Sequence, residues 1–200
     1  MKSIFIFPLP FILMPNQILP LKIFEQKYLF MTKECIKNNE PFGINFKYID
    51  EENNKEPLLD TIGCTANIVQ WDMPELGIFI LQTKGNETYE INSFKNLSNG
   101  LIEAKVKYLT DYETETDVYE EKKEILEALV KVNENINKKL MENKITYQKI
   151  DQNIRDLTYN LTSIISFENK FKQMILHERE DIKRAKLLVK ELKKIGLVNN

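Results

Sequence analysis

The sequence predicts an α+β fold, in which a β-rich unit with one inserted helix precedes a helical bundle. Short apolar segments separated by turns, about one every ten residues, fill the first 110 residues. One early stretch, after Leu21, instead spaces its apolar residues as a helix does. Beyond the linker "TDYETETD" (110–117), helical periodicity continues with one glycine and no proline. We therefore expect two domains, residues 1–115 and 116–200.

Composition indicates an ordinary globular protein. The chain has 200 residues, of which 42% are hydrophobic and 29% charged, and its net charge is −2. Such a balance gives no overall field that would attract nucleic acid or an anionic membrane. The two cysteines, Cys35 and Cys64, form no CxxC pair and predict a reducing compartment without a disulfide framework. We expect a cytoplasmic protein.

The apolar stretch "FPLPFILMPNQILPLKIFEQKYLFM" (7–31) is the first segment that needs an explanation. A secretion signal would require a small-residue cleavage site, and none follows. A membrane helix is excluded because prolines at 8, 10, 15 and 20 would each break it. We expect buried β structure instead, with strands at "SIFIF" (3–7) and "FILM" (11–14) and a turn at "PNQ" (15–17).

The rest of the β-rich unit follows from local patterns. Phe24, Tyr28, Met31 and Cys35 are spaced four, three and four residues apart, which predicts a helix over 25–38. Further strands are expected at 41–49, 61–71, 78–85, 88–94 and 101–109, separated by a polar loop (50–57), "MPELG" (73–77) and a turn at 98–100. This spacing is typical of a compact barrel or sandwich.

Four apolar stripes predict the helices of the second domain. They run from Ile125 to Leu140, from Ile150 to Ile164, from Phe167 to Ile175 and from Ile182 to Ile195. Stripes of this width are expected where helices pack on one another or on a sheet. A helical bundle is therefore predicted.

The residues that enzymes commonly use are sparse in this chain. Its single histidine, His177, and two scattered cysteines cannot form a zinc site of usual spacing. G-x-S-x-G, the phosphate-binding P-loop and G-x-G-x-x-G are all missing from the sequence. Acidic runs at 50–52 and 113–121 fit solvated segments better than acid–base pairs. We predict no catalytic, cofactor or metal site.

Two features could serve binding. In "QWDMPELG" (70–77), large apolar residues lie beside a turn, where they could form a contact surface or, more simply, cap the local core. The basic helix "KRAKLLVKELKK" (183–194) fits a solvated helix better than a nucleic-acid contact.

The same N-terminal string resembles the opening of the Lon protease N-terminal domain, the LON substrate-binding domain. The matching residues are Phe7, Pro8, Leu9, Pro15, Leu19, Pro20, Leu21, Ile23, Phe24, Glu25, Tyr28 and Met31. The blocks 41–44, 62–69 and 76–91 follow in the family's order. The chain departs from the pattern at Asn16-Gln17 (usually glycine), Gln26-Lys27 (usually Pro-Arg) and Thr88 (usually arginine).

The resemblance implies a PUA-like pseudo-barrel followed by a helical bundle, in a stand-alone protein without the ATPase and protease domains of full Lon. It also implies recognition of unfolded or partner protein segments, the partner being, for example, a separate Lon-type protease. The residues we expect to bind are Phe24, Tyr28, Trp71, Met73 and Pro74.

Two other function classes remain open at this point. PUA-like folds also bind nucleic acids or small ligands, which the charge balance makes unlikely here. A family label alone would suggest a hydrolase. The sequence leaves the oligomeric state open.

Overall fold

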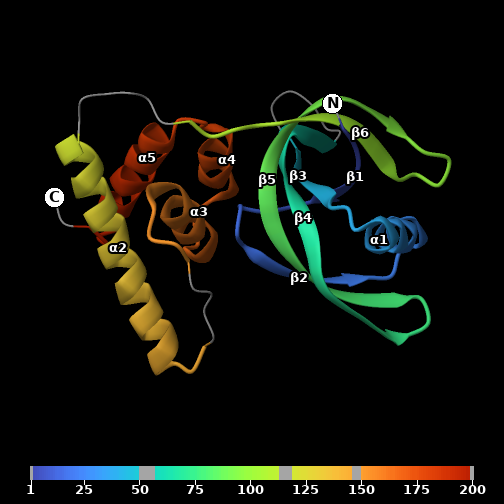
Figure 1. Ribbon diagram of the computed structural model, residues 1–200, viewed down its shortest axis with the longest axis horizontal. Helices are drawn as coiled ribbons and strands as arrows, with labels where there is room; N and C mark the ends of the chain where they lie inside the picture. Colours follow the sequence, from blue (N-terminus) through green and yellow to red (C-terminus); the bar gives the residue numbers. More distant parts are fainter. Residues whose placement is uncertain (1, 50–56, 113–118, 146–149, 199–200) are drawn as a thin grey trace. The chain divides into compact units, whose positions relative to one another are not determined.

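The computed structural model describes residues 2–49, 57–112, 119–145 and 150–198 (Figure 1). The chain divides into two compact units, Met1–Leu109 and Thr110–Asn200. The predicted boundary between 115 and 116 falls among residues outside the described ranges, and it stays a prediction. The elements are β1 (Lys2–Leu9), β2 (Ile18–Ile23), α1 (Gln26–Asn38), β3 (Phe42–Ile49), β4 (Pro57–Glu75), β5 (Ile78–Asn96), β6 (Ile102–Tyr108), α2 (Tyr119–Glu142), α3 (Ile154–Ile164), α4 (Asn169–His177) and α5 (Asp181–Lys194).

In the described part of the chain, five of the six strands close into a barrel. We call this barrel, together with β2 and α1, the barrel unit. Around the ring, β1 pairs in parallel with β3, and β3, β4, β5, β6 and β1 then pair in antiparallel fashion. Closure removes the open edges that a flat sheet would expose. The predicted α+β class, with a β-rich pseudo-barrel and a helical bundle, is confirmed.

Strands β4 and β5 are each 19 residues long and extend beyond the barrel. Their outer parts, Asn67–Glu75 and Ile78–Lys84, pair with each other and turn at Leu76-Gly77. We call these two segments and their turn the β4–β5 arm (Figure 1). Strand β2 joins the arm by pairing with Phe79–Lys84 of β5. The expected turn "MPELG" is therefore shorter than predicted, because Met73, Pro74 and Glu75 belong to β4.

The predicted strand "FILM" (11–14) is wrong. These residues have no regular secondary structure, although Ile12, Leu13 and Met14 are buried. Proline at both ends of the segment removes backbone donors that a strand needs. The predicted turn after Pro15 is present, with Asn16 at a φ of 66°. The strand that does pair begins after this turn, at Ile18.

The barrel interior is organised around Tyr89, which is fully buried. Its hydroxyl donates to the side-chain oxygen of Asn45, whose amide donates to the Asp60 carbonyl at 2.9 Å. Burial raises the pKa of Tyr89 well above its usual range, so the phenol stays protonated. The ring lies over Gly43 and Gly63, where a methyl group would overlap or crowd the tyrosine. Glycine in these two strands is thus required by packing.

The helical unit comprises α2 to α5, so each of the four predicted stripes corresponds to a helix. Ile150 and Phe167, the first residues of two stripes, lie before the starts of α3 and α4. Helix α3 contacts α2, α4 and α5, so it lies at the centre of the bundle. The core is made of leucines and smaller apolar residues on the predicted stripes, among them Leu129, Leu157, Leu161, Ala185, Leu188 and Leu192.

All three arginines of the chain converge on one buried carboxylate, Asp111. Arg155 Nε lies 2.7 Å from Asp111 Oδ2, Arg184 Nη1 lies 3.2 Å from Oδ1, and Arg179 also pairs with Oδ1. The Arg184 side chain is fully buried, pairs with Asp181 and stacks 4.2 Å from the centre of the Tyr159 ring. We call Asp111 and these three arginines the Asp111 cluster.

The segment before α2 is fixed to the same place through its backbone. The N–H of Tyr112 donates to the Arg179 carbonyl at 3.0 Å, and the N–H of Asp181 donates to the Tyr112 carbonyl at 3.0 Å. The chain around Asp111 is thus fixed to the segment between α4 and α5 in two ways. The backbone of Tyr112 forms the hydrogen bonds, and the side chain of Asp111 forms the ion pairs.

Replacing Gly43 by alanine should destabilise the barrel unit by about 1–3 kcal/mol, because the new methyl group collides with the Tyr89 ring. Chemical denaturation of the single variant measures the loss. In a Tyr89→Leu background the same substitution should cost less, because the colliding hydroxyl and ring carbon are gone while the close approach to Ile6 Cδ1 remains. An equal cost in both backgrounds would contradict the packing explanation.

Replacing Asp111 by asparagine should destabilise the helical unit by about 3–5 kcal/mol, since three guanidinium groups lose their shared counter-charge. Loss of helical circular dichroism during denaturation reports the change. The matched control is Glu121→Gln, which removes the exposed pair of Glu121 with Lys186 at 2.7 Å and should cost less than about 1 kcal/mol. Similar losses in both variants would contradict the assigned role of Asp111.

Candidate functional site

The β4–β5 arm carries large apolar side chains that are open to solvent. On β4 these are Val69, Trp71 and Met73, and Leu76 at the turn is 96% exposed. Ile80 adds a further exposed apolar group on β5. Trp71 pairs with Leu81 and Ile80 is the adjacent residue of β5, so Trp71 and Ile80 lie on opposite faces of the arm. Exposed apolar groups gathered on one element mark interaction sites more often than scattered single ones do.

Trp71 belongs to the core and to the surface at once. Its ring meets the buried Phe79 ring edge-on, with the centroids 5.9 Å apart, and it lies opposite the buried Leu81 across the β4–β5 ladder. Half of the Trp71 side chain nevertheless stays exposed, at 50%. It therefore caps the cluster formed by Phe79, Leu81, Ile23 and Leu29 and still offers a broad apolar face.

Phe24 and Tyr28 lie at the connection from β2 to α1, beside the arm. The preceding residue, Ile23, is paired with Phe79 of the arm. Phe24 is largely exposed. Tyr28, by contrast, is half-buried against the Phe7 ring, at a centroid distance of 4.3 Å. Burial raises its pKa, although the Lys27 ammonium 4.8 Å from the ring centre opposes the rise.

The structure places three of the five expected binding residues on the arm and the other two where the neighbouring strand β2 leads into α1. Trp71, Met73 and Pro74 are exposed on the arm, Phe24 is exposed on the adjoining connection, and Tyr28 supports that connection from within the core.

A pocket of about 510 Å³ opens at the end of the barrel where the arm begins. Here β1 and β3 start, β6 ends, and β4 leaves the ring. Its apolar side is formed by Ile36, Ile68, Val69 and Trp71, and its polar side includes Asn67, Asn86, Glu87 and Tyr108. Lys2 and Glu40, which form an ion pair at 3.3 Å, lie at the same opening.

Sequence reasoning missed this pocket. Its residues come from β1, the end of α1, β4, β5 and β6, and only barrel closure brings them together. The one local sign in the sequence was Pro41, which lies between the end of α1 and the first residue of β3.

Cys35 lines the pocket from α1 but is not a reactive nucleophile. Burial raises the pKa of its thiol to about 12, and the nearby Glu40 and Glu34 add to the rise. Attack on a substrate requires the thiolate, which is scarce at neutral pH when the pKa is so high. The pocket is therefore suited to contact rather than to covalent chemistry through Cys35.

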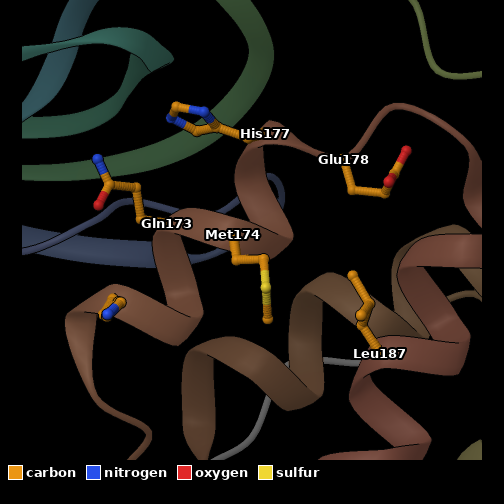
Figure 2. Close-up of a pocket in the computed structure, with 6 residues that line it drawn as sticks. Gln173, Met174, His177, Glu178 and Leu187 are labelled. Atoms are coloured by element: carbon orange, nitrogen blue, oxygen red, sulfur yellow. The ribbon is translucent and has the colours of Figure 1, made fainter.

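The helical unit has a shallow depression between α4 and α5. Figure 2 shows Met174 and Leu187 extending toward the same space, and His177 lines the depression from the end of α4. Lys170, Gln173 and Glu178 complete the lining. The lining thus combines the apolar Met174 and Leu187 with polar and charged side chains.

A search of the described residues found no group of three or more histidine, cysteine, aspartate or glutamate side chains able to hold a metal ion. Nor do the described helices include one that is long and apolar enough to cross a membrane.

This architecture is similar to that of known proteins. Two solved structures share the fold over nearly the whole chain. The Lon N-terminal domain protein from Xanthomonas campestris is 17% identical, with a TM-score of 0.66, and the match covers 95% of this chain and 98% of that one. The N-terminal domain of the Mycobacterium avium complex Lon protease is 12% identical, with a TM-score of 0.67, and the coverage is 94% and 97%. No curated protein sequence matches significantly.

The family assignment comes from the sequence itself. The model of the ATP-dependent protease La (LON) substrate-binding domain matches residues 3–194, which includes both the barrel unit and the helical unit. This range is distinct from the ATPase and protease parts of such enzymes. The chain therefore belongs to the family of LON substrate-binding domains.

Proposed function

We propose that this protein is a non-catalytic binding module for unfolded or partner protein segments, and that it binds them on the β4–β5 arm and the adjoining start of α1. The observation that carries the proposal is the exposed apolar surface of the arm, centred on Trp71. Membership of a substrate-binding family supports the same interpretation. The segment belongs to an unfolded chain or to a partner such as a separate Lon-type protease.

The chemistry of the arm suits weak and adaptable contacts. Trp71 offers a rigid aromatic face, and tryptophan is enriched among residues that dominate binding energy. Met73 has a flexible, polarisable side chain that adjusts to differently shaped partners. Phe24 and Pro74 extend the apolar surface on either side. Tyr28 acts as a positioning residue, because its packing on Phe7 fixes the start of α1.

The barrel unit is less suited to nucleic acid. Phosphate recognition favours the guanidinium group, and all three arginines of the chain are engaged at Asp111 in the helical unit. We also propose a cytoplasmic location, since Cys35 and Cys64 are both free, buried thiols that a reducing compartment preserves.

Trp71→Ala should raise the Kd for an unfolded model substrate, such as carboxymethylated casein, by about tenfold, because a central aromatic contact contributes more than about 1 kcal/mol. Fluorescence anisotropy of labelled casein measures the change. Phe94→Ala is the matched control, since Phe94 is a similarly exposed aromatic residue on β5 beyond the arm, and it should leave the Kd unchanged.

Because Trp71 also contacts Phe79, a second variant separates binding from packing. Leu76→Ser alters only the exposed turn of the arm and should weaken casein binding without lowering the melting temperature. The proposal fails if wild-type protein does not bind casein or any partner captured with it, or if Phe94→Ala weakens binding as much as the arm variants do.

A further inference from the structure

The outer half of β4 is an open sheet edge. Strand β3 pairs with β4 as far as Phe42 opposite Ala66, and within the described part of the chain Asn67–Glu75 then pairs only with β5. Asn67 and all residues from Val69 to Glu75 are exposed. An edge of this kind presents backbone N–H and C=O groups that can pair with another strand.

The edge is open because the chain cannot continue β3 backwards. Asn39 ends α1 in the left-handed conformation, with a φ of 52°, and the N–H of Glu40 donates to the Cys35 carbonyl at 3.0 Å. Pro41 follows and has no N–H to give to a sheet. The space that an extended β3 would fill is the pocket lined by Asn39, Glu40, Pro41 and residues of β4.

The open edge has a defined far end. The N–H of Met73 donates to the Asp72 carboxylate at 2.8 Å, and Pro74 has no N–H. The pairing of β4 with β5 is also irregular between Asp72 and Glu75. Strand β2 forms the opposite edge of the arm, and Pro20 lies in its middle, which is a common protection of edge strands. Asn67–Asp72 is thus the available template.

We propose that the edge Asn67–Asp72 binds an extended polypeptide segment of a partner by strand addition, so that the segment becomes a further strand beside β4. This proposal rests on the proposed function and gives it a mode of binding. Backbone hydrogen bonds supply affinity for any extended segment. Alternate side chains of the added strand reach the apolar pocket wall at Ile36, Ile68 and Trp71 and favour apolar residues there.

Charge at the edge selects among such segments. In the pocket Glu40 is balanced by its ion pair with Lys2, which leaves the charge of Glu87, and Asp72 and Glu75 follow along β4. An acidic rim favours segments with basic flanks, because opposite charges steer association. The occupant is therefore an extended segment of alternating apolar residues flanked by lysine or arginine.

The test uses a short peptide of alternating valine and threonine with lysine at both ends, added to the whole protein. Binding is followed by the emission of Trp71, the sole tryptophan of the chain. In an added strand, every second N–H points toward the template. Two further peptides carry N-methyl groups on alternate residues. In one peptide the odd-numbered residues are methylated, and in the other the even-numbered residues are. We expect methylation of the N–H groups that face β4 to weaken binding by about tenfold or more, and methylation of the other N–H groups to leave binding nearly unchanged.

A glutamate-flanked peptide serves as the charge control and should bind more weakly than the lysine-flanked one, with the difference vanishing at high salt. Strand addition is overturned if both methylated peptides bind equally well or equally badly, or if casein binds while the parent peptide does not. Failure of casein binding as well would instead overturn the proposed function. The two failures are therefore distinguishable.

Discussion

The barrel unit depends on the sharing of one strand, β5, among three neighbours. Its inner part lies between β4 and β6 in the barrel, and its outer part lies between β4 and β2 in the arm. The change of role occurs at Gly85, where a side chain would overlap the Met14 carbonyl oxygen. The backbone of Gly85 also accepts from Asn16 at 2.8 Å and donates to Gln17 at 2.9 Å. The proline-rich segment is thus fixed against β5 at the place where the arm leaves the barrel.

This arrangement explains why the binding surface and the fold cannot be separated. The apolar residues of the arm extend the same strands that line the core, so Trp71 can be anchored by Phe79 and still face solvent. An arm supported in this way keeps its aromatic residue in place before a partner arrives. Less conformational entropy is then lost on binding than with a free loop.

The helical unit uses a different kind of stabilisation. Three guanidinium groups around Asp111 would repel one another without it, and Arg184 is fully buried. Periodicity predicted the four helices because their apolar stripes are regular. It could not predict the Asp111 cluster, because Asp111 lies far in sequence from its partners.

In the barrel unit, too, local features could be predicted from the sequence and contacts between distant residues could not. The helix expected at 25–38 is observed at Gln26–Asn38, because its apolar spacing and its ending residues are local signals. The segment 11–14 was wrongly predicted as a strand. A buried segment that pairs with no strand has the same run of apolar residues as a buried strand. Trp71, Met73 and Pro74 were singled out as large apolar residues beside a turn, and Phe24 through the family resemblance; their part in binding stays a prediction. The open edge of β4 was not found, because an edge is defined by the absence of a neighbour that only the folded topology reveals.

The acidic rim of the arm has a consequence for molecules of the same kind. If two copies paired edge to edge in parallel and in register, Asp72 and Glu75 of one would lie beside those of the other, and like charges would oppose the pairing. A bare strand edge is a liability in a crowded cell, where it can seed a growing sheet. Here the carboxylates discourage self-assembly and leave the edge available to segments of opposite charge.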